Sequence, residues 1–246
     1  MMKNIKLITQ YDGTDFCGWQ CQDNGRSVQQ TLQDAISQLT GEKITLYGCS
    51  RTDAGVHAAG HVSNFRTESN IPPERFSYAL NVLLPQDLKV LTSCEAPEDF
   101  NARFKAKSKR YRYCIQYGIS PQALWNRYAY YSPKAPDIEK MQQAAHAFVG
   151  EHDFRGFQAS GGTAKSTVRR ILSCEVSQIA PNVVAIDIEG TGFLYNMVRI
   201  IAGTLLFVGI GKISADSISD IIASGSRKRG GKTLTPCGLM LMEVKY

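Results

Sequence analysis

Apolar and polar residues alternate along this chain with two different periods, and each period predicts one type of element. Residues 4–13, NIKLITQYDG, have strand composition and end in a turn signal. The next segment, RSVQQTLQDAISQLTG, carries apolar residues at helical spacing, namely Val28, Leu32, Ala35, Ile36 and Leu39. Ser27 and Gln30 form a capping box at its start, and Gly41 is a stop signal at its end. We therefore predict a strand followed by an amphipathic helix.

The rest of the first half continues this alternation. Strands are predicted at residues 43–48, 60–67 and 87–96, and a helix at residues 74–83. Pro72 and Pro73 stand where that helix is expected to begin. The first half is therefore predicted to have the order β-α-β-β-α-β.

The second half repeats the alternation of strands and helices. Strands are predicted at residues 108–117, 167–179, 182–190 and 238–246, and helices at residues 137–150, 193–209 and 214–224. The polar, glycine-rich stretch at residues 159–167 is predicted to be a mobile loop. Two halves of this type with antiparallel connections indicate an α+β fold rather than a doubly wound parallel sheet. We expect residues 1–104 to form an N-terminal α+β half and residues 105–246 a C-terminal α+β half.

The composition favours a folded protein in a reducing compartment. With 246 residues and 43% hydrophobic content, the chain can bury a substantial core. Its seven cysteines are irregularly spaced, and no apolar signal segment follows the charged start. The longest apolar stretch, residues 200–210, is shorter than the roughly 18 residues that a membrane-spanning helix needs. We therefore expect a cytoplasmic protein without a membrane span.

The positive charge is concentrated in one segment. Residues 103–112, RFKAKSKRYR, contain six Lys or Arg and no acid. The charge of this segment equals the net charge of the whole chain, +6. Such a concentration of positive charge favours a polyanionic partner. If the strand begins early enough, one face carries Lys105, Lys107, Lys109, Tyr111 and Tyr113. Such a face suits single-stranded or looped nucleic acid, because phosphates meet cations and bases stack on tyrosines. The alternative is that the tyrosines are half-buried sheet residues, and the pattern leaves both interpretations open.

Two pairs of potential metal ligands fall at zinc-like spacing. They are Cys17 with Cys21 and His57 with His61, with three residues between the members of each pair. The separation of the two pairs does not match a compact zinc finger, and nothing in the pattern brings them together. We therefore expect no zinc site here.

The segment SRKRGGKT, residues 226–233, ends like a phosphate-binding P-loop. Ser226 stands where the first glycine of that motif belongs, and no predicted strand precedes the segment. Arg227, Lys228 and Arg229 are expected instead to form a phosphate-contacting patch.

The turn RTDAGVH, residues 51–57, offers three interpretations of its carboxylate. Asp53 can cap backbone N–H groups in an Asx-turn while Gly55 supplies a positive φ. It can also join His57 and His61 in a metal-dependent hydrolase. In the third interpretation it is a nucleophile.

The nucleophilic interpretation needs a cation near Asp53. A carboxylate inside a pocket stays ionised when it pairs with a buried positive charge. Arg51 is a candidate nearby in the sequence, and Arg199 is a better one because it lies among apolar residues, where an unpaired charge is costly.

Four motifs together resemble one known family. They are QYDGTDFCGWQ, SRTDAGVHAAGHVSNF, NARFKAKSKRYRY and GTGFLYNMVRIIAG, and the similarity extends to TPCGLMLMEV. In these motifs and their order, nearly the whole chain resembles the TruA family of tRNA pseudouridine synthases. The resemblance implies isomerisation of uridine to pseudouridine at positions 38–40, in the anticodon stem-loop of tRNA. It also implies a homodimer, no cofactor or metal, and two RNA-recognition-motif-like halves joined through an extended, mainly antiparallel sheet flanked by helices.

The resemblance also implies a role for each candidate residue. Asp53, in the N-terminal half, would attack the target nucleoside as the nucleophile. From the C-terminal half, Arg199 would pair with Asp53 and Tyr111 would stack on the target uracil, while Arg51 would help to hold the extruded nucleotide. Further contacts to tRNA are expected from Arg103, Lys109 and Arg110. A non-catalytic RNA-binding protein is the alternative, since it needs only the basic face and the tyrosines.

Overall fold

The computed structural model describes residues 2–23 and 25–246, which fall into two compact units. Unit 1 comprises Met1–Lys107 and Leu241–Tyr246, and unit 2 comprises Ser108–Met240. This division lies close to the expected boundary between residues 104 and 105, but it assigns the last six residues to unit 1. The predicted division into halves of residues 1–104 and 105–246 stays a prediction.

Unit 1 is built on an antiparallel sheet with β1 in the middle. β1 (Lys3–Tyr11) pairs with β3 (His57–Thr67) on one side and with β4 (Leu88–Glu95) on the other. The two-residue β2 (Tyr47–Gly48) pairs with β3, which gives the order β4-β1-β3-β2. With its helices the unit reads β-α-β-β-α-β, the predicted order and that of a ferredoxin-like fold.

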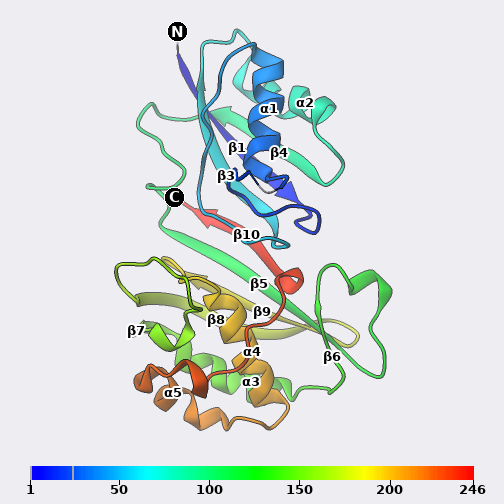
Figure 1. The fold of residues 1–246 in the computed structure, drawn as a ribbon, viewed down its shortest axis with the longest axis vertical. Coiled ribbons are helices and arrows are strands. Elements are labelled where there is room, and N and C mark those ends of the chain that lie inside the picture. The colour runs from blue at the N-terminus through cyan, green and yellow to red at the C-terminus, as the bar shows by residue number, and fades with distance from the viewer. Residues whose placement is uncertain (1, 24) are drawn as a thin grey trace. The chain divides into compact units, whose positions relative to one another are not determined.

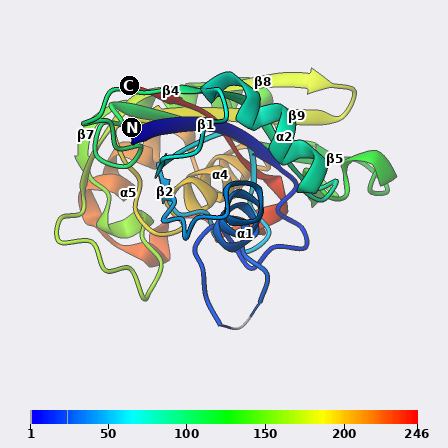
Figure 2. The ribbon, with the colours of Figure 1, turned by 90° about the horizontal axis from the view of Figure 1, so that it is seen from above.

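The first predicted helix is confirmed, together with both of its end signals. α1 (Val28–Thr40) begins after Ser27, whose hydroxyl accepts the N–H of Gln30 at 3.2 Å. It ends at Gly41, which has a φ of 74° and donates its N–H to Ser37. The buried residues of α1 are Val28, Leu32, Ala35 and Ile36, and Figures 1 and 2 show the helix against one face of the sheet. The second helix of the unit consists of η1 (Pro73–Arg75), which begins at the predicted prolines, and α2 (Phe76–Leu83).

The strand predicted at residues 43–48 is wrong for most of its length, because only Tyr47 and Gly48 pair in the sheet. The main chain of Leu46 bonds instead to amide side chains of α1. Its N–H donates to Gln33 Oε1 at 3.1 Å, and its carbonyl accepts from Gln29 Nε2 at 2.9 Å. The glutamines therefore replace a neighbouring strand and hold the buried Leu46 against the core.

Within unit 2, neighbouring strands are hydrogen-bonded in the order β5-β9-β8-β7. Its antiparallel strands are β5 (Ser108–Tyr117), β9 (Val183–Gly190), β8 (Val168–Ala180) and β7 (Gly150–Asp153). The short β6 (Tyr130–Ser132) runs parallel to β5. The predictions did not include β6 or β7, which are too short to show a period of their own.

The helices of unit 2 are α3 (Ile138–Ala145), α4 (Met197–Gly209) and α5 (Ile218–Ser224). Short 3₁₀ turns complete it: η2 (Ala123–Trp125), η3 (His146–Phe148), η4 (Arg155–Phe157), η5 (Ala215–Ser217), η6 (Arg227–Arg229) and η7 (Pro236–Gly238). The predicted start of α4 at residue 193 is wrong. Asn196 has a left-handed φ of 60°, and the helix begins only after it.

The last strand, β10 (Leu239–Lys245), is divided by the boundary between the units at Met240. Within unit 1, the N–H of Lys107 donates to the carbonyl of Lys245 at 2.8 Å. The predicted α+β class, with mainly antiparallel sheets and flanking helices, is confirmed in both units. In the part of the chain that the structure describes, no helix has the length and apolarity needed to span a bilayer.

Candidate functional site

Asp53 lies in a tight turn of unit 1 that is closed by the main chain. The N–H of Val56 donates to the carbonyl of Asp53 at 3.1 Å, and Gly55 between them has a φ of 77°. A positive φ at this position is what a type II turn requires. The carbonyl of Asp53 therefore accepts the hydrogen bond that closes the turn, and the residue is half-buried.

A second glycine-containing segment holds this turn from the outside. Trp19 donates its N–H to the carbonyl of Thr52 at 3.1 Å. A Cβ at Gly18, whose φ is 112°, would lie 2.6 Å from the same carbonyl oxygen. A Cβ at Gly13 would lie 2.0 Å from the carbonyl oxygen of Val56. The motifs QYDGTDFCGWQ and SRTDAGVH thus pack main chain against main chain, which only glycine allows at these two places.

The two histidines after the turn are core residues of unit 1. His57 is 1% exposed, and its Nδ1 accepts the N–H of Gly13 at 2.9 Å. His61 is fully buried, donates from Nε2 to the carbonyl of Ser50 at 3.0 Å, and stacks on Trp19. Within residues 2–23 and 25–246, no three His, Cys, Asp or Glu side chains are grouped so as to hold a metal ion. Both histidines therefore have packing and hydrogen-bonding roles that account for their positions.

In unit 2, Tyr111 and Tyr113 share a face of β5 and are both buried. Tyr111 is 7% exposed and meets the ring of Phe193 edge to face, with centroids 5.2 Å apart. Tyr113 is completely buried and donates its hydroxyl to the carbonyl of Thr235 at 2.7 Å. Burial raises the pKa of Tyr113 well above its usual value. Of the two interpretations of this face, the sheet-residue alternative therefore holds for Tyr113.

Arg199 projects from the first turn of α4 and is held by two neutral acceptors. Its Nε donates to the carbonyl of Leu234 at 2.7 Å, and its Nη1 donates to the side-chain oxygen of Asn196 at 2.6 Å. The N–H of Leu234 also points to the carbonyl of Arg199, at 3.4 Å. These hydrogen bonds give the guanidinium a fixed orientation.

The predicted basic face is shorter than expected, because β5 begins at Ser108. Lys105 lies before the strand and pairs with Asp99, with 2.6 Å between Nζ and the carboxylate.

On β5 itself, an acid on the neighbouring strand offsets part of the charge. The Asp187 carboxylate accepts hydrogen bonds from Nε and Nη2 of Arg112 and lies 3.4 Å from Nη1 of Arg110. Its hydrogen bonds to Arg112 raise the pKa of that arginine. Arg103 is exposed and lies over the ring of Phe104, and Lys109 is half-exposed.

The glycines of SRKRGGKT pack against α4 and form no phosphate loop. The N–H of Gly231 donates to Thr204 Oγ1 at 2.8 Å, and a Cβ at Gly231 would lie 2.3 Å from the carbonyl carbon of Gly203. Arg227 holds the segment by donating to the carbonyl of Gly231 and to Thr233 Oγ1. Arg227 therefore has a structural role in unit 2, and the phosphate-contacting patch of Arg227, Lys228 and Arg229 stays a prediction.

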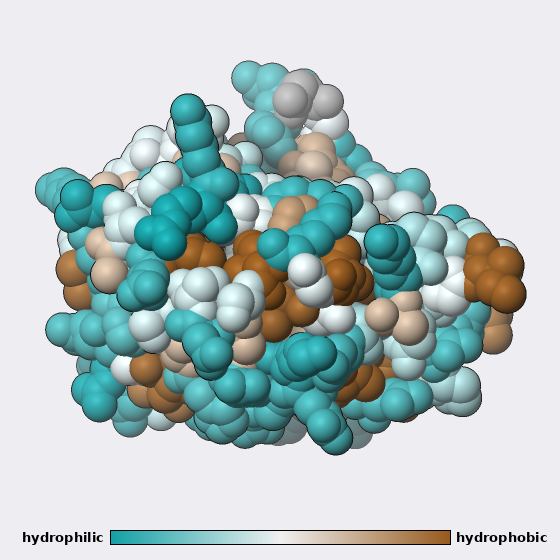
Figure 3. Space-filling model, turned by 90° about the horizontal axis from the view of Figure 1, so that it is seen from below, coloured by the Kyte–Doolittle hydropathy of each residue, from teal (hydrophilic) through white to brown (hydrophobic). Residues whose placement is uncertain are grey.

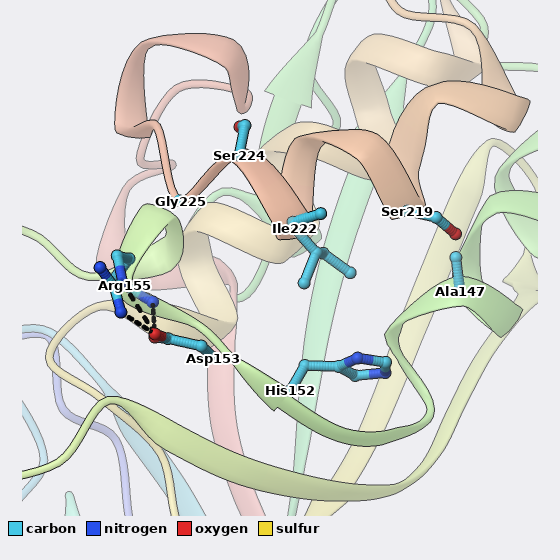
Figure 4. A pocket seen from close by; sticks show the side chains of 9 residues that line it. Ala147, His152, Asp153, Arg155, Ser219, Ile222, Ser224 and Gly225 are labelled. Carbon is cyan, nitrogen blue, oxygen red and sulfur yellow. Dashed lines mark hydrogen bonds and ion pairs between the residues drawn. The ribbon is translucent and has the colours of Figure 1, made fainter.

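A cavity of about 370 Å³ lies elsewhere in unit 2, between α5 and β7 (Figure 4). Its lining includes His152, Asp153, Arg155 and Ile222. Hydrogen bonds from Arg155 and Thr167 lower the pKa of Asp153 to about 2. None of the predicted site residues lines this cavity.

Three residues that position the candidate residues were not among the predicted ones. Asn196 and Leu234 orient Arg199, and Trp19 supports the turn of Asp53. Asn196 could have been found from the sequence, because asparagine tolerates the left-handed conformation and is a preferred residue just before a helix. Leu234 acts through its carbonyl, for which the sequence has no signal.

Comparison with known proteins gives consistent matches. A family model described as tRNA pseudouridine synthase matches residues 7–105 and 144–246. tRNA pseudouridine synthase A of Acetivibrio thermocellus is 53% identical over 245 residues, covering 100% of both chains. The protein of the same name from Ruminiclostridium cellulolyticum is 48% identical over 246 residues, again covering 100% of both chains. Among solved structures, the crystal structure of a Cbf5-Nop10-Gar1 complex matches with a TM-score of 0.39 and 12% identity, over 97% of this chain and 57% of that one. A structural likeness of this degree carries no argument about function.

Proposed function

Because this chain belongs to the tRNA pseudouridine synthase family, we propose that it isomerises uridine at positions 38–40, in the anticodon stem-loop of tRNA, with Asp53 as nucleophile. The predicted family and the isomerase class are confirmed by the relatives. The position in tRNA and the roles of individual residues are our proposal. A homodimer and a cytoplasmic location stay predictions.

The observation that carries the assignment of Asp53 is the construction of its turn. The Asp53 carbonyl accepts the hydrogen bond that closes the turn, and Trp19 binds the carbonyl of Thr52 just before it, so the main chain at Asp53 is fixed on both sides. A nucleophile must be fixed in place before reaction, because positioning supplies much of the rate enhancement. A carboxylate on a glycine-supported, half-buried turn meets this requirement.

The reaction balances without any further reactant. Asp53 attacks the target nucleoside, and the N1–C1′ bond of the uridine breaks. The uracil rotates, a C5–C1′ bond forms, and the proton at C5 is lost while N1 gains one. No oxidation state changes, and the carboxylate is regenerated.

Arg199 is proposed to keep Asp53 ionised during this reaction. A carboxylate has its pKa lowered by a cation at close range. Hydrogen bonds to Leu234 and Asn196 hold the guanidinium in one orientation, and this positioning supports the role.

The target base must leave the stem before it can react, at a cost of a few kcal/mol. Tyr111 is proposed to stack on the extruded uracil, and Arg51 to help to hold the extruded nucleotide. Arg51 is exposed, as this role requires. Contacts to phosphates from Arg103, Lys109 and Arg110 would offset the cost of extrusion.

The test is chemical mapping of pseudouridine in unmodified tRNA after incubation with the protein. We expect modification at positions 38–40 by the wild type and by Asp15→Asn, which removes an exposed acid of the same unit. Asp53→Asn should bind tRNA but leave it unmodified. Activity in Asp53→Asn would overturn the nucleophile, and binding without modification by the wild type would favour the non-catalytic alternative.

A further inference from the structure

Tyr195 exposes an aromatic ring between buried neighbours in unit 2. Its exposed fraction is 46%, whereas Leu194 and Met197 are 5% and 1% exposed. Single apolar groups on a protein surface are ordinary, and Figure 3 shows several among hydrophilic side chains. Tyr195 differs from such groups because it lies in the turn that orients Arg199.

The backbone that carries this ring is fixed on both sides. The carbonyl of Tyr195 accepts the N–H of Ala159 at 3.1 Å, and Met197 donates its N–H to Leu194 at 3.0 Å. Asn196, in its left-handed conformation, accepts a hydrogen bond from Arg199. A ring presented from such a backbone loses little conformational freedom when a ligand covers it.

Two cations belong to the segments next to this turn. Arg169 lies beside Gly192, since a Cβ there would be 3.7 Å from its Nε. Its guanidinium donates to the carbonyls of Ser166 and Val168, at 2.9 and 2.6 Å, and these neutral acceptors do not offset its charge. Lys165 is exposed on the 159–167 loop, whose first residue bonds to Tyr195.

We propose that Tyr195 stacks on a tRNA nucleotide adjacent to the target uridine, while Arg169 and Lys165 contact the phosphates beside it. An exposed ring with cations on the neighbouring segments is a combination that binds unpaired nucleotides, because bases stack on the ring and phosphates are attracted to the cations. The inference rests on the proposed function, since it places the contact next to the residue that would pair with Asp53. It adds a binding determinant that the reaction itself does not require.

The experiment measures the dissociation constant for unmodified tRNA in the wild type, Tyr195→Ala and Tyr195→Phe. Tyr78→Ala is the matched control, because Tyr78 on α2 is 75% exposed and belongs to unit 1. We expect Tyr195→Ala to weaken binding about 5- to 150-fold, the range measured for a lost base–aromatic stack. Tyr195→Phe keeps the ring and should bind within about twofold of the wild type.

Salt dependence separates stacking from charge. Arg169→Gln should reduce the slope of log K against log salt by about 0.9, while Tyr195→Ala should leave that slope unchanged. If Tyr195→Ala also lowers the thermal midpoint, Tyr195→Leu repeats the comparison with apolar bulk retained and the ring removed.

The inference would be overturned if the dissociation constant of Tyr195→Ala were within about twofold of that of Tyr78→Ala. Where Tyr195→Leu is needed, its dissociation constant is compared in the same way. That result, in a wild type that makes pseudouridine, leaves the proposed function intact. A wild type that binds tRNA without modifying it overturns the proposed function, and the binding comparison can still be made.

Discussion

The imidazole of His61 stacks on the indole of Trp19, with ring centroids 3.6 Å apart and planes inclined by 21°. Each partner also bonds to the main chain just before Asp53, His61 to the carbonyl of Ser50 and Trp19 to that of Thr52. The ring pair therefore supports the segment that leads into the turn, and a histidine that looked like a metal ligand in the sequence is part of the core.

Replacing His61 by alanine should loosen this support. The variant loses a buried aromatic pair and leaves the Ser50 carbonyl without its donor. We therefore expect the free energy of unfolding to fall by about 2 to 4 kcal/mol. Urea unfolding measures the change, and kcat should fall with it. His146→Ala, at an exposed histidine, should change stability by less than about 0.5 kcal/mol. Full stability with lost activity would indicate a chemical role for His61 instead.

Gly18 and Gly41 both have positive φ, but only Gly18 lies against the Asp53 turn. Gly41→Ala should cost about 1 kcal/mol of stability through backbone strain alone, because nothing lies within 4 Å of its Cβ position. Gly18→Ala adds a clash with the carbonyl of Thr52 and should lower kcat as well. Thermal unfolding and a pseudouridine assay measure the two effects. Equal activity in both variants would contradict the supporting role of Gly18.

Asn196 and Asn182 form a second pair of test position and matched control, since both have a φ of 60°. Glycine tolerates this conformation, so Asn196→Gly and Asn182→Gly should both retain their backbone. Only Asn196→Gly loses the oxygen that accepts from Arg199, and we expect its kcat to fall by about tenfold, the cost of one hydrogen bond to a charged group. Steady-state kinetics on tRNA test this, and an unchanged kcat would show that Arg199 does not depend on Asn196.

Arg103 should contribute to tRNA binding only through a contact between its side chain and a phosphate group of the RNA. Arg103→Ala should reduce the slope of log K against log salt by about 0.9. Lys140→Ala is the control, because Lys140 is exposed on α3 and pairs with Asp137. A salt titration of binding gives both slopes, and equal slopes for the two variants would exclude a phosphate contact by Arg103.

Cysteine reactivity follows burial. Burial raises the pKa of Cys114 to about 11 and that of Cys174 to about 12, so both thiols stay protonated at pH 8. Iodoacetamide should therefore modify the exposed Cys94 first, as peptide mass spectrometry would reveal. Modification of Cys174 in the folded protein as fast as Cys94 would contradict its burial in the sheet.

Local signals were sufficient to predict most of the helices and long strands. Ser27 and Gly41 mark the ends of α1 because caps act through neighbouring residues. The prediction was wrong where a partner distant in sequence decides the structure. Residues 43–46 have strand composition, yet Gln29 and Gln33 on α1 take the hydrogen bonds that a strand would have made.

The same limit applies to the candidate site. The motifs indicated Asp53 and Arg199, but the neutral acceptors of Arg199 come from residues 3 and 35 positions away. The excess of positive charge on residues 103–112 was evident, whereas its partial neutralisation by Asp187 depends on the register that places Arg112 opposite Asp187. Such pairings depend on the register of the assembled sheet and cannot be predicted from the local sequence.

Because residues 241–246 belong to unit 1, the order of synthesis affects how that unit is completed. The ribosome produces Met1–Lys107 first, but the strand that bonds to Lys107 emerges only after all of Ser108–Met240. During that interval the nascent unit carries an unpaired edge, which can pair with other chains or recruit a chaperone. The part of the protein that bears Asp53 is therefore begun first and finished last.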